Sequence, residues 1–559
     1  MFFRKVTTKS GGKEYTYLKL IENYREGSKV KQRVIANLGN LENMTPDKVQ
    51  SLITGLSKIC GLDTQFDQQI SNKLVLDFGT VAAVNKIWRI LNLDFHIKEC
   101  VGTAGSNSFP LMVKLLVLNQ VIKNHQRLPL NVWCKKLYMP EMQNEEISEE
   151  GYNAALKKLI AIKEKLEERI LLDLQNQALV DTETVFCHLL RGKMLSPAAY
   201  DEQNFFNHYP VRENVDMAVL TSQEGIPFRH RTFKGHFSDG ETVPRRINEL
   251  KQQFGIKRCV FVGDQHIITG ENVQLLVSYG HEYIIGVEIW SSPEVKNLME
   301  DMHKVPGDFV KHSEDLLYRE IQEGPVRYLL CYSPSRAARK NEELENRLTF
   351  IEKELENIKQ WVATDCSDNP RANFFKATNI LRNYYCKRYF ECVYNEEQRE
   401  FSYRRNDKVI EDQQLYNGKF ILKTNCNTLT STEIIEAYTL FSKLKNTFRQ
   451  MRGFYRYENS PFNESLIGGQ VQVSVISYLI EQMMELMLQQ NNIKISASKA
   501  LDILEGIKIT INQMGDNEVA LLTPATSEQL AILQALHIDY DKIKIEFEGV
   551  SSSLAATSS

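Results

Sequence analysis

The sequence predicts a multidomain α/β protein, with a mixed sheet preceded by a helical domain and by an N-terminal β-hairpin region. Three observations predict this class. The chain has 559 residues, which is too long for one ordinary domain. Hydrophobic residues make up 42% and charged residues 25%, which is typical of a folded globular protein and excludes a largely disordered chain. The hydrophobic period changes from helical spacing to alternating strands and helices at about residue 178.

The net charge and the cysteines indicate which kinds of partner and which cellular compartment are compatible with this chain. The formal net charge is -3, so a nucleic-acid binder would have to concentrate its positive charge locally. Residues 1–60 do so, with eleven Lys and Arg against five Asp and Glu, although a solvated face has the same composition. The ten cysteines form no CxxC pair, which is typical of a reduced, cytosolic protein. We expect no membrane span and no secretory signal, because no apolar run approaches 18 residues and the N-terminus lacks an apolar segment.

The first two domains are predicted from local patterns. In the first, residues 1–75, the first 40 residues read as short strands, with apolar and polar side chains alternating at 16–40 around a turn, and a helix follows from Thr45 to about Ile59. The second, residues 76–175, is helical, because its apolar residues recur at three- and four-residue spacings.

The third domain, residues 176–290, reads as three strands, a helix, a strand, a helix and a strand. The first strand contains Asp181, and the next two form a hairpin around Glu224-Gly225. A helix is expected over 238–254, and the strand that follows it ends at Asp264.

The rest of the chain divides into an insertion at 291–415, a completion of the core at 416–495 and a C-terminal region at 496–559 whose tail is expected to be disordered. Leucines and isoleucines at 4-3-4-3 spacing over 337–361 indicate an intramolecular helical hairpin or a coiled coil. Residues 385–425 have strand patterns. A long helix over 431–453 is expected to be capped by Ser431 or Thr432.

Two aspartates stand out by their positions. Asp181 falls within an apolar strand pattern and Asp264 ends another. A carboxylate in a strand core is unfavourable unless it is paired, hydrogen-bonded or metal-bound. Two such groups brought together would suit Mg²⁺ or Mn²⁺, which can activate a water or a 3′-hydroxyl for attack on a phosphodiester. The alternative is that each aspartate only caps a neighbouring loop or helix.

Residues 181–287 resemble the catalytic core of insertion-sequence transposases of the DDE class, which have an RNase H-like fold. The resemblance rests on DTETVFCHLL, on GHFSD at the place of the family's G-N-x-x-D motif, and on VFVGDQH around the second catalytic aspartate. The same order of elements continues over most of the chain. The resemblance implies that Asp181 and Asp264 are catalytic and hold Mg²⁺ or Mn²⁺.

The third acidic position departs from the family. In the signature helix, Tyr438 matches the family's Tyr and Arg452 its final base, but Phe441 stands at the Arg position and Lys445 at the catalytic Glu. An ammonium cannot ligate Mg²⁺. Lys445 would instead neutralise the aspartates in a metal-free site or bind a phosphate.

Other acids are poor substitutes for the missing Glu. Glu436 lies nine residues upstream, Glu458 and Glu464 lie beyond Gly453, and Glu183 is one step along the strand from Asp181.

The signature helix also predicts a DNA contact. Lys445, Arg449 and Arg452 share one helix face, and Arg456 joins them if the helix continues. With Tyr438 they form a predicted phosphate-contacting surface, and a solvated face is the alternative. The histidines His230, His236 and His266 are not required by two-metal chemistry.

Three functions follow. The first is an active transposase that binds double-stranded DNA at terminal inverted repeats and at a target, cleaves it and transfers strands. The second is a catalytically impaired member that still binds DNA. The third is a structural or interaction protein on the same scaffold. The resemblance implies a homodimer in the DNA complex and a place in the bacterial cytosol, associated with DNA and not with a membrane.

Overall fold

The described part of the chain falls into two units. The computed structural model describes residues 2–10, 13–26, 29–40, 48–49, 71–102, 108–122, 130–142, 147–195, 212–234, 256–288, 295, 297, 309–363, 370–395, 397, 400–450, 464–514 and 517–547. The first unit takes in 1–78, 506–525 and 539–559, and the second takes in 79–505 and 526–538.

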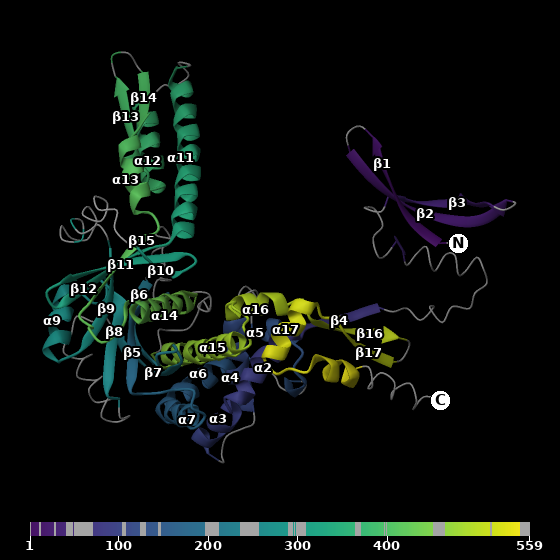
Figure 1. The fold of residues 1–559 in the computed structure, drawn as a ribbon, viewed down its shortest axis with the longest axis horizontal. Helices are drawn as coiled ribbons and strands as arrows, with labels where there is room; N and C mark the ends of the chain where they lie inside the picture. Colours follow the sequence, from purple (N-terminus) through teal and green to yellow (C-terminus); the bar gives the residue numbers. More distant parts are fainter. Residues whose placement is uncertain are drawn as a thin grey trace. The chain divides into compact units, whose positions relative to one another are not determined.

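An antiparallel three-stranded sheet begins the first unit (Figure 1), with β2 (Lys13–Glu26) between β1 (Phe2–Ser10) and β3 (Lys29–Asn40). The short strands predicted for the first 40 residues are confirmed. Of the predicted helix at 45–59, the structure describes only residues 48–49, which are helical.

A second sheet of this unit joins segments that are far apart in the sequence. The strand β16 (Lys508–Met514) pairs antiparallel with both β4 (Ser71–Asp77) and β17 (Asn517–Leu522). The sequence predicted no strand at 71–77, which lies within the region assigned to the N-terminal domain. Local patterns do not reveal a pairing partner more than 400 residues away.

The helical domain predicted at 76–175 is confirmed as helical. Its helices are α2 (Gly79–Ile90), α3 (Leu93–Val101), α4 (Ser108–Val121), α5 (Leu130–Trp133), α6 (Glu149–Ala161) and α7 (Lys163–Asn176). The apolar stripe that predicted α2 is buried, because Val81, Val84 and Ile87 are at most 1% exposed.

Nine described strands form the central sheet, in the order β10-β11-β12-β15-β9-β8-β5-β6-β7. The strands β5, β8 and β9 run parallel to one another, and every other neighbouring pair is antiparallel. Their bounds are β5 (Thr184–Leu195), β6 (Arg212–Thr221), β7 (Pro227–Lys234), β8 (Arg258–Asp264), β9 (Glu282–Val287), β10 (Val310–Ser313), β11 (Leu316–Glu323), β12 (Val326–Tyr332) and β15 (Lys419–Thr424).

One sequence expectation for this sheet is wrong. The strand expected to contain Asp181 begins only at Thr184, because the polar run before it forms a turn. Strands β10 to β12, which fall in the predicted insertion at 291–415, extend the central sheet. The hairpin around Gly225, the strand that ends at Asp264, the helix α9 (Gly270–Ser278) and the strand β9 are confirmed. The helix expected at 238–254 lies outside the described residues.

Two long helices pack on one face of this sheet (Figure 1), namely α14 (Ser431–Gln450) and α15 (Glu464–Gln490). The start of α14 is fixed by Thr430, whose side chain and backbone exchange hydrogen bonds with Glu433. Thr430 therefore caps α14, and the expectation of Ser431 or Thr432 is wrong.

The helix α15 is relevant to the expectation that the chain has no membrane-spanning helix. Among the described residues, it contains one stretch, Leu466–Gln490, that is long and apolar enough to cross a membrane. Of its most apolar window, 94% is buried inside the fold, as in the core helix of a globular protein.

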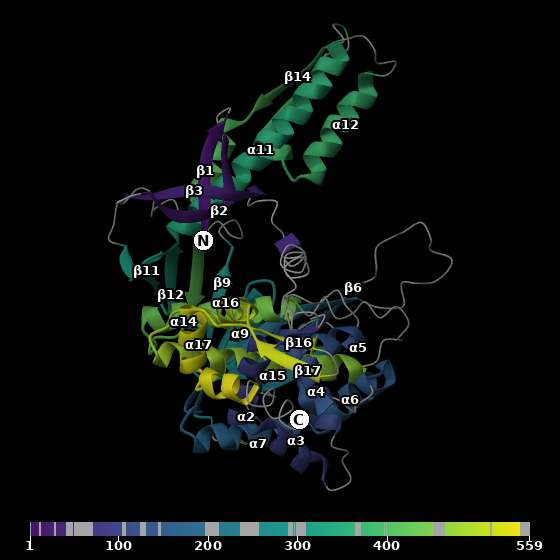
Figure 2. The same ribbon diagram turned by 90° about the vertical axis from the view of Figure 1, so that its right-hand side faces the viewer.

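The remaining insertion, 334–416, has a core of its own (Figure 2). It consists of α11 (Pro334–Ala363), α12 (Pro370–Asn383), β13 (Phe390–Asn395), β14 (Glu400–Arg405) and α13 (Asp407–Tyr416). The 4-3-4-3 seam of α11 is buried against these elements, so the intramolecular hairpin predicted for it is confirmed. The strand pattern expected at 407–416 is wrong, since Asn406 caps a helix there. The last described helices of the second unit are α16 (Ala497–Leu504) and α17 (Ser527–Ala535).

Candidate active site at the end of β8

The carboxylate of Asp264 is held at the carboxyl end of a buried strand. Apolar side chains and backbone pairing on both sides fix β8, and Asp264 is its last residue. The turn that follows binds the aspartate, because its Oδ1 accepts a hydrogen bond from the backbone N–H of His266 at 3.1 Å and its carbonyl accepts one from Ile268 at 2.9 Å. The side chain is only 11% exposed. One carboxylate oxygen, Oδ2, is left for a partner outside the turn.

That partner is Lys445 of α14. Its Nζ donates to Oδ2 of Asp264 at 2.6 Å, and half of the lysine side chain remains exposed. One turn earlier on α14, the buried ring of Phe441 lies with its centroid 5.9 Å from the same Nζ. Lys445, which the resemblance places at the third acidic position, therefore faces Asp264.

The structure does not bring Asp181 to this site. Asp181 is exposed, lies three residues before β5 and accepts a hydrogen bond from the backbone N–H of Glu183 at 2.9 Å. In the parallel pairing of β5 with β8, Thr184 lies opposite Arg258, at the start of both strands. Asp264 lies six residues further along, so the two aspartates are at opposite ends of the strands, roughly 20 Å apart.

A second acid–base pair lies near Asp264. Asp216 of β6 is fully buried and accepts two hydrogen bonds from the guanidinium of Arg191 on β5, at 2.7 and 3.0 Å. The pKa of Arg191 is raised, first by its hydrogen bond to Asp216 and also by the negative charges of Asp216 and Asp264. This pair was not predicted from the sequence. Each residue is a charge within a strand pattern, but only the register between β5 and β6 shows that the two lie opposite each other.

On α14, the side chain of Tyr438 lies close to Asp264. Its ring packs against β9 at a residue with no side chain, because a Cβ on Gly286 would lie 1.9 Å from the tyrosine Oη. Burial, and then the charge of Asp264, raise the pKa of Tyr438 to about 12. The hydroxyl therefore stays protonated at neutral pH. Because its ring is inserted beside β9, Tyr438 is in a poor position for the DNA contact predicted for it.

The N-terminal region provides the link to known proteins. Residues 3–65 match the family model described as IS1634 family transposase, N-terminal domain. Over these residues, the chain is similar to the N-terminal domain of an insertion-sequence transposase. The DDE class is consistent with that family. No curated protein matches the chain.

The other residues predicted to contact DNA are only partly described. Lys445 is exposed on α14 but paired with Asp264. Arg449 lies in the last turn of α14, and nothing is described of its side chain. Arg452 and Arg456 lie outside the described residues, so the predicted basic surface is seen only at its beginning.

The other acids and histidines do not complete a catalytic set within the part of the chain that the structure describes. Glu183 pairs with Lys257 at the far end of β8, and Glu436 is exposed on α14. His266 pairs with Glu288 at 3.0 Å. His236, Glu458 and the side chain of Glu464 lie outside the described residues.

His230 belongs to a buried cluster that joins α7 to β7. Its Nδ1 lies 2.7 Å from Oε1 of Glu167, and Lys163 donates to the carbonyl of His230 at 2.7 Å. Burial lowers the pKa of His230. This group has a structural role and is far from solvent.

The described residues do not fit a divalent cation. No cluster of three or more His, Cys, Asp or Glu able to hold a metal occurs among them. At Asp264, an ammonium already occupies the carboxylate oxygen that would face the ion, and Asp216 is fully paired with Arg191. Mg²⁺ needs several oxygen ligands and is repelled by a lysine in this position.

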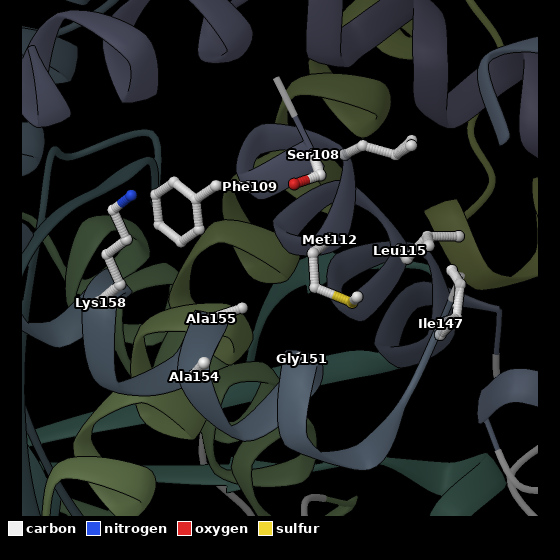
Figure 3. Close-up of a pocket in the computed structure, with 10 residues that line it drawn as sticks. Ser108, Phe109, Met112, Leu115, Ile147, Gly151, Ala154, Ala155 and Lys158 are labelled. Carbon is white, nitrogen blue, oxygen red and sulfur yellow. The ribbon is translucent and has the colours of Figure 1, made fainter. Parts of the chain in front are cut away.

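A pocket of about 290 Å³ lies elsewhere, between α4 and α6 (Figure 3). Its lining is mostly apolar, and the ammonium of Lys158 lies 4.7 Å from the ring centroid of Phe109 at one side. None of its lining residues is acidic or a histidine. It therefore lacks the groups for phosphodiester chemistry.

Proposed function

We propose that this chain is a DNA-binding transposase whose catalytic position is closed by an ion pair, so that it binds DNA without cleaving it. The observation that carries the proposal is the 2.6 Å contact between Lys445 and Asp264. A carboxylate at position 445 would add a metal ligand beside Asp264. The lysine supplies the neutralising charge itself.

The central sheet supports the transposase reading. The antiparallel strands β7, β6 and β5 are followed by β8 and β9, which run parallel to β5. This is the strand order that the RNase H-like resemblance implies, and it places Asp264 at the carboxyl ends of the parallel strands. Ligands of α/β sheets bind at that edge.

The N-terminal sheet supports DNA binding. Arg4 and Lys19 lie directly opposite each other on β1 and β2, an arrangement in which like charges repel. An anion bound at this face relieves the repulsion, and a phosphate backbone supplies such charges in a row. We infer that double-stranded DNA with inverted-repeat ends contacts this sheet, that two copies act together there, and that the protein works in the bacterial cytosol.

The alternative proposal is an active transposase that uses Mg²⁺ or Mn²⁺ at Asp181 and Asp264. It requires Asp181 to move from the far end of β5 and Lys445 to leave Asp264. Because Lys445 is half exposed, a DNA phosphate could attract its ammonium away from the aspartate.

Divalent-metal-dependent nicking of supercoiled plasmid separates the two proposals. The wild type and the variants Asp181→Ala, Asp264→Ala and Lys445→Glu are compared in Mg²⁺ and in Mn²⁺. We expect no nicking by the wild type, and activity, if any appears, only in Lys445→Glu. Nicking by the wild type that is lost in Asp264→Ala would overturn the closed-site proposal in favour of the active enzyme.

DNA binding is tested separately, with a duplex oligonucleotide of the element's end over a range of salt concentrations. Because each phosphate contact releases a counterion, we expect affinity to fall steeply with salt. The double substitution Arg4→Gln/Lys19→Gln should weaken binding without unfolding the sheet, since it removes a repulsion. If neither the salt concentration nor this substitution changes the affinity for DNA, the structural or interaction protein is the better explanation.

A further inference from the structure

The charges of the insertion 334–416 are segregated between its helices. The helix α11 carries acidic and basic residues in equal number. In contrast, α12 and the turn after it, residues 370–389, contain five Lys and Arg and no Asp or Glu. The charged residues of α12 itself are therefore all basic along its length of roughly 20 Å.

The exposed face of α12 also carries aromatic rings. Phe375 is 64% exposed and Tyr385, two residues after the helix, is 84% exposed. Neither ring is needed to cover the core of the subdomain, which is closed by the opposite face of α12 through Ala377 and Leu381. Helix spacing places Phe375 on the same side as Arg382, seven residues on.

The backbone at Tyr385 is strained. Its φ is +55°, in the left-handed region that a bulky residue rarely adopts. The left-handed residue belongs to the C-terminal cap of α12, in which the backbone N–H of Cys386 donates to the carbonyl of Leu381 at 2.7 Å. The neighbouring ring of Tyr384 contacts Phe350 of α11 at 5.1 Å between centroids, whereas the ring of Tyr385 stays exposed, two residues before Lys387.

The helix dipole does not explain this face. A cation near the carboxyl end of a helix is stabilised by the dipole, which accounts for Arg382. It does not account for Lys376 in the first half of α12, whose Nζ lies 5.2 Å from the ring centroid of Trp361, nor for the exposed rings.

We propose that α12 and the turn after it bind single-stranded DNA, with phosphates on the basic side chains and unstacked bases on Phe375 and Tyr385. Positive charge interleaved with exposed aromatic faces is the combination that tracks a single strand, because every base has a stacking face and every nucleotide a phosphate. Paired bases offer no free face to these rings, so duplex DNA fits this surface less well. The surface is independent of Asp264 and of the N-terminal sheet.

The test measures binding of the full-length protein to fluorescent dT20 and to a 20-base-pair duplex. The aromatic variant is Phe375→Ala/Tyr385→Ala and the charge variant is Arg382→Gln/Lys387→Gln. Matched controls are Tyr279→Ala, a ring on another element that is 41% exposed, and Lys353→Gln, an exposed lysine flanked by acids on α11.

We expect the aromatic variant to bind dT20 about tenfold more weakly and the duplex almost unchanged. The charge variant should lower the salt slope for dT20 by about 1.4, and the controls should match the wild type. The proposal is overturned if dT20 binding survives in both variants, or if duplex binding falls as much as dT20 binding. If only Arg4→Gln/Lys19→Gln loses duplex binding, the result supports the proposed function and does not test single-strand binding by α12. The two proposals can therefore be refuted independently of each other.

Discussion

At the scale of single residues, two carboxylates with similar sequence patterns have opposite environments. Asp216 is buried and bound twice by Arg191, whereas Asp181 is exposed in a turn. Removing one partner of a buried pair leaves an uncompensated charge. We expect Asp216→Asn to lower the free energy of unfolding by about 3 kcal/mol, and Asp181→Asn to change it by less than about 0.5 kcal/mol. Urea unfolding of both variants measures this, and equal effects would contradict the assignment of Asp216 to the core.

His188 is predicted to make stability depend on pH. It is fully buried, bonded to Thr221 at 3.0 Å, and burial lowers its pKa to about 3. The unfolded chain takes up a proton below about pH 6.5 and the folded chain does not, so stability is lost as the pH falls below 6.5. From pH 6.5 to 5 this loss is about 2 kcal/mol for one proton.

The matched variant is His188→Gln, which keeps a hydrogen-bonding side chain but cannot titrate. Urea unfolding at pH 7 and pH 5 should show a smaller loss in the variant by about 2 kcal/mol. The same loss in both proteins would mean that His188 is protonated in the folded state.

At the scale of elements, the packing of α14 on β9 depends on Gly286. The close approach of Tyr438 leaves no room for a Cβ there. We expect Gly286→Ala to destabilise the fold by about 2 kcal/mol, and a second substitution, Tyr438→Ala, to make the added methyl nearly neutral. Gly270→Ala is the control, since nothing lies within 4 Å of its Cβ position. Thermal unfolding of the four variants would show additive losses if the two residues did not meet.

The sequence predicted most elements, because each depends on a local period. The α11 seam and the strand that ends at Asp264 were found in this way. The exceptions have physical causes. Polar residues before Thr184 form a turn that shifts the start of β5. The register between β5 and β8, in which Thr184 lies opposite Arg258, separates Asp181 from Asp264. The contact of Lys445 with Asp264 could be predicted from the motif. The Arg191–Asp216 pair could not, because it depends on the register between strands.

At the scale of the whole molecule, the two units share one chain in an interleaved order. The first unit takes residues from both ends of the sequence, and the second takes residues on both sides of β16 and β17. Folding of the first unit therefore needs a contact between β4 and β16 that forms only after nearly the whole chain exists. Loop-closure entropy makes such a pairing slow and the last to be gained.

The pairing of β4 with β16, which local sequence patterns do not reveal, can be tested. Ile511 lies opposite Leu74 in the middle of β16, and proline at that position removes a ladder hydrogen bond and disfavours strand pairing. We expect Ile511→Pro to raise amide hydrogen exchange across residues 71–77, more than 400 residues away in sequence. Exchange across β8 should stay as in the wild type, because β8 belongs to the other unit. Ile511→Val, which keeps the strand, is the control. Faster exchange in β8 as well would show that the two units unfold together, and unchanged exchange at 71–77 would refute the pairing of β4 with β16.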